Sequence, residues 1–339
     1  AKPSTGGETL EQMAARGEPN ALVRIGRFYQ KGLNGYPLDE AKGLEYFQQA
    51  AEKNYPIAMY NTALCLLQGR GTPHHRKDPK AAFEMIKKAV PLSDSYPIVL
   101  SQYGEMLLEG TGCAKQPLEA LKIFQKGDSL NDGYSQYLLA NLYSEGAPGI
   151  PQDMTKALNL YDKSARNGCS QATHDKAFYY LTEQNDITQA VNLFKKAANQ
   201  KNTDALLNLG KIYSVNRYHM VDYAQALNYY KQGADLKDPL CTTEYAKCIL
   251  KGQGCVVQTK RAADFFKKAI DFDRSGTLTI IARFEYARML FEGEGIAQNI
   301  RESVRYFKDV VEAEADLLDS AEKKNARIKA LYYYGKILI

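Results

Sequence analysis

A glycine-rich stretch, KGQGC at 251–255, is the first place in this sequence where chemistry could be expected. Gly-x-Gly beside a lysine is typical of a phosphate-binding loop, and a cysteine on flexible backbone can act as a nucleophile. A phosphate loop, however, follows a strand and opens directly onto a helix that begins with Lys and Ser or Thr. Here the glycines follow a helical apolar segment, and several residues separate them from the next predicted helix. We therefore predict that they end a helix in a turn.

The same turn recurs along the chain, which places it in a repeat. Its relatives are QGRGT (68–72), EGTGC (109–113), EGAPGI (145–150), EGEGI (292–296) and the looser KGLNGY (31–36). TEQND (182–186) and SVNRYHM (214–220) stand at the same place without the glycine pair. We expect the bend to differ in those two repeats.

Two helical segments flank each turn. The first, helix A, has one small residue near its middle, which we call the slot. The slots are spaced 33 to 48 residues apart, at Gly26, Ala63, Gly104, Ala140, Ala177, Gly210, Ala246, Ala287 and Gly335. The second, helix B, carries a small residue, a large one four positions on and a small one three further on, as in Gly43, Phe47 and Ala50. These offsets share one helical face, so the pattern predicts a solenoid of helix pairs.

Helix B is predicted to begin after a capping residue four positions before its first small residue. Asp and Asn there accept hydrogen bonds from the free backbone N–H groups of the first helical turn. Six of the eight positions hold Asp or Asn, and two hold glutamine, a weaker cap. In chain order they are Asp39, Asp78, Gln116, Asp153, Asp186, Asp222, Gln258 and Asn299.

Most of the cysteines fall at packing positions, where other repeats carry alanine or a larger apolar residue. We expect these to behave as buried small apolar side chains rather than as reactive thiols. They are Cys65, Cys113, Cys241, Cys248 and Cys255, whereas Cys169 ends a helix B and has no assignment.

The histidines offer no convincing site either. His74 and His75 are adjacent in GTPHHRKDP, but no third ligand has suitable spacing, which favours a solvated loop over a metal site. His174 and His219 are isolated from any nucleophile-and-acid arrangement. We predict no catalytic centre, no cofactor and no metal site.

The repeat resembles the Sel-one-like repeat family, a relative of the tetratricopeptide repeat. The resemblance covers about residues 20–312 and is carried by units such as EYARMLFEGEGIAQNIRESVRYFKDVVE (285–312) and YLLANLYSEGAPGIPQDMTKALNLYDKSARNG (137–168). It implies an all-α, right-handed superhelical solenoid of antiparallel helix pairs that binds other proteins. Family members act in quality control at the endoplasmic reticulum, in regulating cell-wall synthases and in bacterial contacts with host cells. Some carry disulfides between paired helices, but the cysteines here do not form one such pair per repeat.

We expect a lead-in and capping segment at 1–19 and one solenoid over 20–339, with about eight complete repeats and a partial ninth. The repeats are predicted to start near residues 21, 58, 99, 135, 172, 205, 241, 282 and 326. The chain stops inside the ninth helix A, at YYYGKILI, whose apolar face would be uncovered. We therefore expect a fragment of a longer protein.

Binding should use the helix A surface, which lines the concave face of tetratricopeptide-like proteins. The residue after each slot, and the one a turn later, should face this groove. The groove is predicted to be acidic in the middle repeats, to offer one aromatic anchor and to become basic in the later repeats. The predicted partner-binding residues are Glu105, Glu109, Asn141, Glu145, Phe178, Lys211, Lys247, Lys251 and Arg288. We expect a protein or peptide partner whose acidic part lies near Lys211, Lys247 and Arg288.

The amino-acid composition argues against some classes of function. The 339 residues are 45% hydrophobic and 24% charged, with a net charge of +5, which is too weakly basic to suggest a nucleic-acid partner. No apolar run reaches the roughly 18–20 residues of a membrane span, so we expect no insertion into a membrane. Nothing resembles a signal peptide, which slightly favours the cytoplasm. Because the chain starts at Ala1 without methionine, a secreted, periplasmic or ER-lumenal protein with a removed signal stays open.

These observations predict a non-catalytic scaffold or adaptor that binds a partner segment along helix A. One alternative is the regulatory or substrate-recruiting region of a larger protein whose catalytic or membrane part lies outside this chain. Another is a binder of small molecules or cell-wall fragments in the groove.

Overall fold

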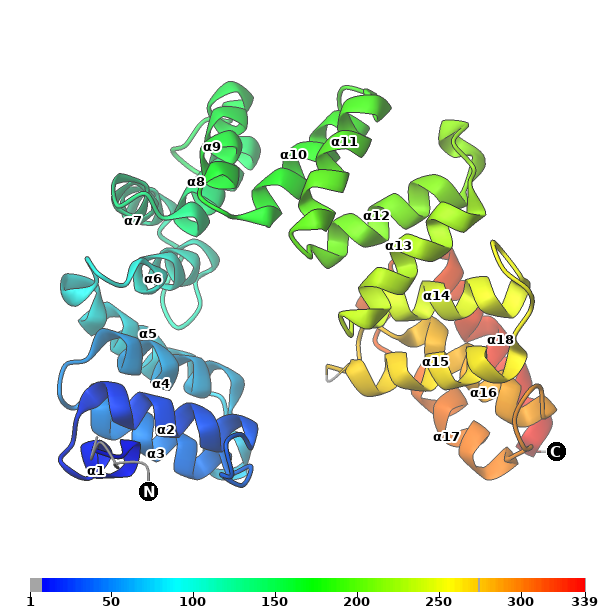
Figure 1. The fold of residues 1–339 in the computed structure, drawn as a ribbon, viewed down its shortest axis with the longest axis horizontal. Helices are drawn as coiled ribbons and strands as arrows, with labels where there is room; N and C mark the ends of the chain where they lie inside the picture. Colours follow the sequence, from blue (N-terminus) through cyan, green and yellow to red (C-terminus); the bar gives the residue numbers. More distant parts are fainter. Residues whose placement is uncertain (1–7, 274, 339) are drawn as a thin grey trace, which may run out of the picture. The chain divides into compact units, whose positions relative to one another are not determined.

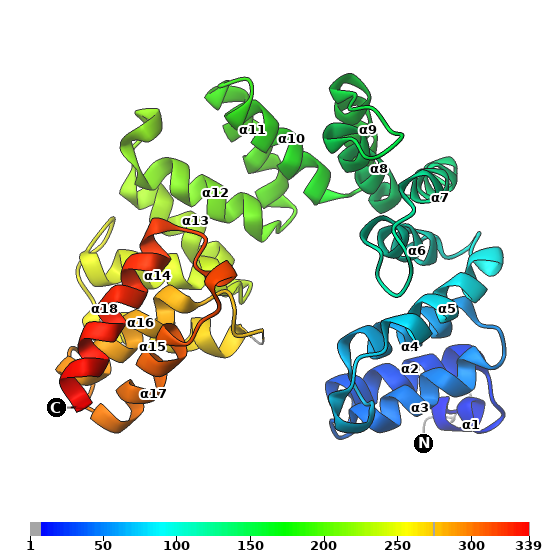
Figure 2. The same cartoon turned by 180° about the vertical axis from the view of Figure 1, so that it is seen from behind.

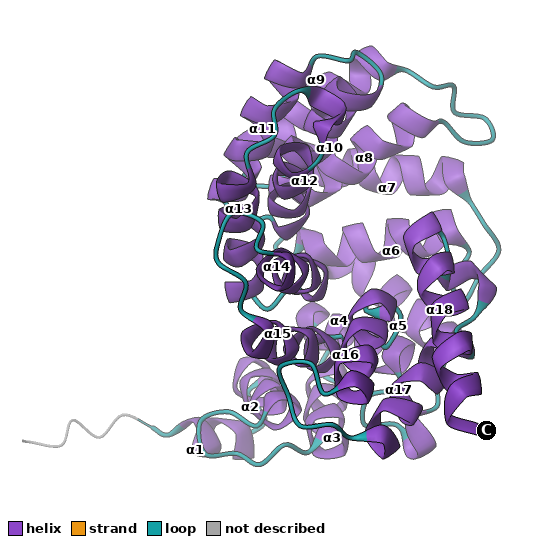
Figure 3. Cartoon of the chain, turned by 90° about the vertical axis from the view of Figure 1, so that its right-hand side faces the viewer, coloured by secondary structure: helices purple, strands orange, loops and turns teal. Residues whose placement is uncertain are grey.

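The computed structural model describes residues 8–273 and 275–338, in which helices are joined by turns and loops and no strand occurs (Figure 3). The predicted all-α fold is confirmed. The helix A series comprises α2 (Pro19–Lys31), α4 (Pro56–Gln68), α6 (Pro97–Glu109), α8 (Gly133–Glu145), α10 (Ser170–Thr182), α12 (Thr203–Ser214), α14 (Pro239–Lys251), α16 (Ile280–Glu292) and α18 (Ala321–Leu338). The helix B series comprises α3 (Glu40–Ala51), α5 (Pro79–Ala89), α7 (Pro117–Ser129), α9 (Met154–Arg166), α11 (Ile187–Asn199), α13 (Tyr223–Asp235), α15 (Thr259–Phe272) and α17 (Ile300–Val311).

A short helix, α1 (Leu10–Ala15), precedes the first pair. It lies within the predicted lead-in segment, of which residues 1–7 lie outside the described part. Four single-turn 3-10 helices lie in the connections: Pro73–His75, Val90–Leu92, Asn216–Tyr218 and Ala315–Leu317.

The helices form two compact units, which we call the N-half (up to Ala172) and the C-half (from Thr173). In each, successive A and B helices alternate along the chain, as the colour sequence in Figure 1 shows. Apolar side chains of neighbouring repeats merge into continuous cores. The N-half core extends from Ala14 to Ile150, and the C-half core extends from Ala177 to Ala330. No repeat buries its apolar face alone, which is the usual source of stability in a solenoid.

The slot allows helix B to lie close to helix A of the same repeat. A Cβ atom at Gly210 would come closer than 3.0 Å to the ring of Tyr230, the large residue of the paired helix B. Gly104 has the same relation to Phe124, and Gly26 to Phe47. The large residues are almost fully buried, so each ring fills the space that the missing side chain leaves.

The predicted caps are found where expected. Six helix B segments begin at an Asp or Asn side chain that accepts a backbone N–H bond from the first turn, as Asp39 does from Lys42 at 2.9 Å. Gln116 and Gln258 occupy the cap position without a capping bond, and their side-chain amides instead donate to carbonyls two residues earlier.

The glycine pairs form turns, as predicted. A different structural requirement explains each of the two glycines. Gly252 ends α14 in the left-handed conformation, at φ 69°. Gly254, at φ 77°, lies so close to the preceding repeat that a Cβ would come closer than 3.0 Å to the carbonyl of Tyr223, the first residue of α13. The second glycine of three other turns contacts the first helix B residue of the preceding repeat in the same way. These pairs are Gly71 with Glu40, Gly112 with Pro79, and Gly295 with Thr259.

Candidate partner-binding site

The predicted binding residues of the N-half differ in how accessible their side chains are to a partner. Glu105, on α6, accepts a 3.0 Å hydrogen bond from the Tyr134 hydroxyl, and desolvation raises the pKa of its carboxyl above the usual range. It lines a pocket of about 400 Å³ together with Tyr60 and Ile98. Glu109 and Glu145, at the ends of α6 and α8, are exposed.

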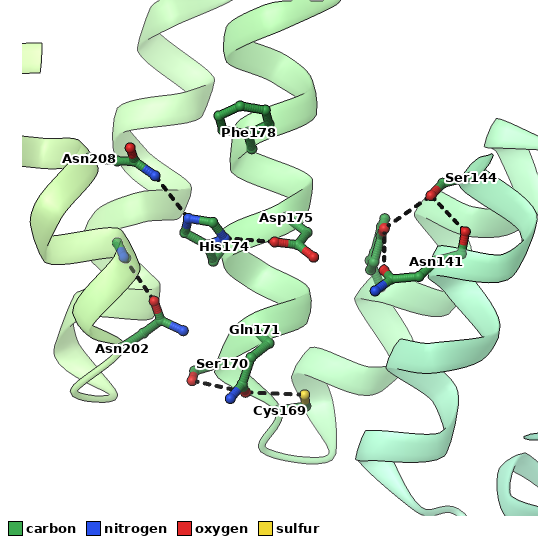
Figure 4. A network of polar contacts seen from close by, with 12 residues as sticks. Asn141, Ser144, Cys169, Ser170, Gln171, His174, Asp175, Phe178, Asn202 and Asn208 are labelled. Atoms are coloured by element: carbon green, nitrogen blue, oxygen red, sulfur yellow. Dashed lines mark hydrogen bonds and ion pairs between the residues drawn. The ribbon is translucent and has the colours of Figure 1, made fainter. Parts of the chain in front are cut away.

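Asn141 is occupied within its own repeat. Its side-chain oxygen accepts a 2.7 Å hydrogen bond from the Tyr161 hydroxyl of the paired helix α9 (Figure 4). Ser144, one turn later, lies within 3.5 Å of the same hydroxyl and donates to the Asn141 carbonyl. The Asn141 side chain therefore helps to join α8 to α9.

In the C-half, two of the predicted basic residues are held in ion pairs. Lys247 lies 2.8 Å from Glu244 and 2.7 Å from Glu322, and its side chain is only 16% exposed. Burial alone would lower the pKa of Lys247, but the two glutamates outweigh it and raise this pKa above its ordinary value. The lysine is therefore charged, but its charge is already matched.

Arg288 is surrounded more completely. Its guanidinium pairs with Glu285 at 3.1 Å, with Glu292 at 2.6 Å and with Glu294. Burial opposes the charge, and the three carboxylates still raise the pKa of Arg288. An incoming acidic segment would have to displace these carboxylates. Lys247 and Arg288 are therefore less available to a partner than their positions in the sequence predicted.

Phe178 and Lys211 are brought together. They lie on α10 and α12 and line one pocket of about 730 Å³ in the C-half. Phe178 is 48% exposed, and Leu181, Ile212 and Val215 add apolar surface. The rest of the wall comes from residues 182–187 and 215–219, which include the two turns that lack the glycine pair.

The charge around this pocket is positive. Lys211 and Arg217 line it, no acidic side chain does, and neither cation forms an ion pair with another described residue. The Arg217 guanidinium lies 5.5 Å from the Tyr218 ring. Lys251, at the end of α14, is exposed and lies outside this pocket.

A histidine that sequence reasoning set aside supports the aromatic wall. His174 stacks on Phe178, with ring centroids 6.4 Å apart, and contacts the buried Phe194 ring at 5.4 Å (Figure 4). Asn208 donates to its Nε2 at 2.9 Å, which leaves Nδ1 to donate to Asp175 at 2.7 Å. His174 therefore positions Phe178. The signal in the sequence was the spacing of four residues between the two rings, which puts them on one helical face.

Eight segments of this chain match a single protein-family model, that of the Sel1 repeat. They are residues 19–55, 56–90, 98–127, 133–169, 177–202, 203–238, 239–271 and 280–308, which together exceed half of the chain. The chain belongs to the Sel1 repeat family. The resemblance seen in the sequence is confirmed, and Sel1 repeat proteins typically mediate protein–protein interactions without catalysis.

Known proteins similar to this Sel1 repeat chain include two fungal regulators. Chitin synthase regulatory factor 3 of Schizosaccharomyces pombe is 26% identical over 161 residues, 45% of this chain and 16% of its own length. Chitin synthase regulator SKT5 of Saccharomyces cerevisiae is 25% identical over 241 residues, 68% of this chain and 34% of its own. The chain thus spans only about a sixth to a third of these relatives.

Among solved structures, a Sel1 repeat protein from Oxalobacter formigenes is 25% identical, with a TM-score of 0.55 over 66% of this chain and 90% of that one. The yeast Tom70 structure has a TM-score of 0.60 at 17% identity, over 100% of this chain and 67% of that one, and shows likeness of fold alone.

The other residues considered for chemistry in this Sel1 repeat chain lie apart. His74 and His75 are exposed in the turn after α4. Across residues 8–273 and 275–338, no three His, Cys, Asp or Glu side chains converge in a geometry that could hold a metal ion. None of the described helices is both long enough and apolar enough to cross a membrane.

The cysteines of this Sel1 repeat chain are free and differ in burial. Cys65, Cys241 and Cys248 are buried, and burial raises the pKa of the Cys65 and Cys248 thiols to about 11 and raises that of Cys241 further. Cys113, Cys169 and Cys255 are partly exposed.

We expect thiol labelling to divide the cysteines in the same way. In the folded protein at pH 8, a disulfide reagent should modify Cys113, Cys169 and Cys255 first, because it can reach these partly exposed sulfurs, whereas burial both shields the other three and suppresses their reactive thiolate form. Peptide mapping by mass spectrometry during a time course checks the order. Early labelling of Cys241 would contradict the packing interpretation, and denaturant should make all six cysteines react.

Proposed function

We propose that this chain is a non-catalytic interaction scaffold that binds an acidic segment of a partner protein at the pocket between α10 and α12. The observation that carries the proposal is the pairing, in one pocket of about 730 Å³, of an exposed aromatic ring with cations that lack ion-pair partners among the described residues. Aromatic anchors in pockets supply much of the binding energy of interfaces, and charge complementarity sets partner choice.

The lining defines the chemistry of the occupant. Phe178, Leu181 and Ile212 favour an apolar side chain, whereas Lys211 and Arg217 favour a carboxylate beside it. The amides of Asn185 and Asn208 add hydrogen-bonding groups of the kind that backbone recognition needs. An extended peptide with an apolar residue next to Asp or Glu satisfies all three requirements.

Other predicted binding residues lie outside this pocket and could still contact a partner protein of the scaffold. In the N-half, Glu105, Glu109 and Glu145 give helix A surfaces of the opposite charge, and we propose that they contact basic groups of a partner. Lys251 remains a candidate because it is exposed and makes no ion pair with a described residue. The fungal relatives are named as regulators of chitin synthase, which supports a regulatory scaffold rather than a catalytic domain.

A peptide-display selection against the whole chain tests the pocket. Selected peptides should combine an apolar residue with Asp or Glu, and their affinity should fall as salt rises, because the carboxylate is recognised at a solvent-accessible site. In fluorescence-anisotropy titrations, Lys211→Glu should weaken binding about tenfold and Phe178→Ala about thirtyfold, the range of a charged rim contact and an aromatic anchor.

The matched control is Lys196→Glu. Lys196 is exposed on α11, so its replacement changes the net charge equally without touching the pocket. Equal loss of affinity in Lys196→Glu and Lys211→Glu would reduce the effect to overall charge and refute the site. Selected peptides without acidic residues would refute the proposed chemistry.

A further inference from the structure

The pocket of about 400 Å³ in the N-half, which we call the Glu105 pocket, has a lining of unusual composition. Its walls come from three successive A helices, α4, α6 and α8, which follow one another along the N-half (Figure 2). Two carboxylates, Glu105 and Asp132, line it together with the rings of Tyr60 and Tyr134 and the side chain of Ile98. No Lys, Arg or His of the described residues lines it. The pocket therefore combines negative charge with aromatic and apolar surface.

The charge of Glu105 is unmatched within the described part of the chain. Glu105 directly follows the slot Gly104, at the register position that Lys247 and Arg288 occupy in later repeats. Side chains of the chain neutralise both of those cations, whereas no described Lys, Arg or His forms an ion pair with Glu105. Glu105 is only partly exposed, and desolvation raises the pKa of its carboxyl. Because burial disfavours an uncompensated charge, a cation from outside the chain would stabilise this carboxylate.

The Glu105 carboxylate keeps one oxygen for a ligand. Its Oε1 accepts the 3.0 Å hydrogen bond from the Tyr134 hydroxyl, and its Oε2 accepts none from another described residue. An arginine guanidinium pairs best through both oxygens of a carboxylate, whereas a lysine ammonium acts as a point charge and needs only one. The geometry therefore favours lysine over arginine.

The other walls suit the rest of a lysine side chain. An ammonium is attracted to the face of an aromatic ring, and Tyr60 and Tyr134 supply two rings. Ile98 is 43% exposed and offers apolar contact to the methylenes of lysine. A metal ion fits less well, because within residues 8–273 and 275–338 no three His, Cys, Asp or Glu side chains converge to hold one.

Asp132 holds one wall of the pocket in place. Its Oδ2 caps α8 by accepting from the backbone N–H of Ser135 at 2.7 Å, and it also accepts from the Ser101 hydroxyl of α6 at 3.3 Å. The Ser101 and Ser135 hydroxyls are themselves hydrogen-bonded at 2.9 Å. These bonds join the start of α8 to α6, so the Tyr134 ring is positioned before a ligand arrives.

We propose that the Glu105 pocket binds the side chain of a lysine from a partner protein. The ammonium lies against Oε2 of Glu105 and the two tyrosine rings, and the methylenes lie along Ile98. The assignment rests on the proposed scaffold function and names the basic group that Glu105 contacts. It does not depend on the α10–α12 pocket, whose ligand has the opposite charge.

A peptide-display library tests the ligand class. Every peptide carries one fixed lysine, flanked by random residues other than Asp, Glu, Lys and Arg, which excludes the acidic ligands proposed for the α10–α12 pocket. Peptides selected on the whole chain and acetylated at the amino terminus should bind saturably in fluorescence-anisotropy titrations. Replacing the lysine with norleucine keeps the methylenes, removes the ammonium and should weaken binding about tenfold. Replacing it with arginine should weaken binding about threefold.

Two protein variants locate the binding. Glu105→Gln keeps an oxygen that can accept from Tyr134 and removes the charge, so affinity should fall about tenfold. Tyr60→Leu removes one ring but keeps apolar surface, and affinity should fall about threefold. The matched control is Glu84→Gln, because Glu84 is exposed on α5 and its replacement changes the net charge equally. Phe178→Ala should leave the affinity unchanged, since that ring lines the other pocket.

The proposal fails if no peptide of this library binds saturably, or if norleucine or arginine binds as tightly as lysine. Equal losses of affinity in Glu105→Gln and Glu84→Gln would also overturn it, because only the net charge would then matter. A loss in Phe178→Ala would assign the lysine peptide to the α10–α12 pocket. If acidic peptides show no binding while lysine peptides respond to Glu105→Gln, the α10–α12 site is refuted and the Glu105 pocket stands.

Discussion

Replacing Gly254 with alanine should lower the free energy of unfolding by about 3–4 kcal/mol. About 1–2 kcal/mol comes from forcing a side chain into the left-handed conformation, in which Gly254 has a φ of 77°. The remainder, about 1–3 kcal/mol, comes from overpacking, because the new Cβ meets the Tyr223 carbonyl at the start of α13. Guanidinium unfolding, followed by circular dichroism, measures the change.

Gly168→Ala separates the two contributions. Gly168 follows α9 with a φ of 88°, and nothing lies within 4 Å of its missing Cβ. Its replacement should lower the free energy of unfolding only by the cost of the left-handed conformation, about 1–2 kcal/mol. If the two variants were equally destabilised, the contact between the turn and the preceding repeat would contribute nothing.

Asp273→Asn should destabilise the C-half by about 2–4 kcal/mol. The Asp273 carboxylate is 6% exposed and accepts from Gly276 N, Leu278 N and Thr279 N at 2.9–3.0 Å, as well as from the hydroxyls of Ser275 and Thr279. An asparagine turns one acceptor atom into a donor and leaves buried N–H groups without a partner, which is costly. Urea unfolding measures the loss, with Asp271→Asn, an exposed position near the end of α15, as the control.

The contribution of Asp273 should depend on pH with a definite sign. Burial alone would raise the pKa of Asp273, but the hydrogen bonds outweigh it and hold the pKa below its ordinary 3.8. A depressed folded-state pKa gives stability that is fully present above 3.8 and is lost as the pH falls through the folded value. The gap between wild type and Asp273→Asn should be constant from pH 7 to about 5 and should narrow below 3.8. A gap that widens on acidification would contradict this assignment.

The sequence predicted those parts of the fold that depend on short-range chemistry. A side chain four positions before helix B caps it because the bond is local, and the six Asp and Asn caps form accordingly. Gln116 and Gln258 fail for an equally local reason, since their longer side chains reach back to the preceding loop. The slots were predictable because one small residue must recur wherever two helices touch.

The candidate site was less predictable because its chemistry depends on neighbours that are distant in the sequence. Register alone assigns Lys247 to the helix A surface, but its partner Glu322 lies 75 positions away, in a helix of another repeat. The bond between His174 and Asn208 likewise spans 34 positions. The network around Asp273 lies in a connection that no other repeat shares, so no periodic pattern could reveal it.

In four repeats the second glycine of the turn contacts the backbone of the preceding helix B, and this contact separates two properties that usually vary together. At these four turns backbone atoms help to set how far one repeat advances from the last, and this contribution does not depend on which side chains fill the core. Position pairs such as Leu206 with Leu207 and Thr242 with Thr243 can then differ in chemistry while remaining buried at the same places. The solenoid can therefore accumulate core substitutions over evolutionary time without losing the spacing of its surface residues.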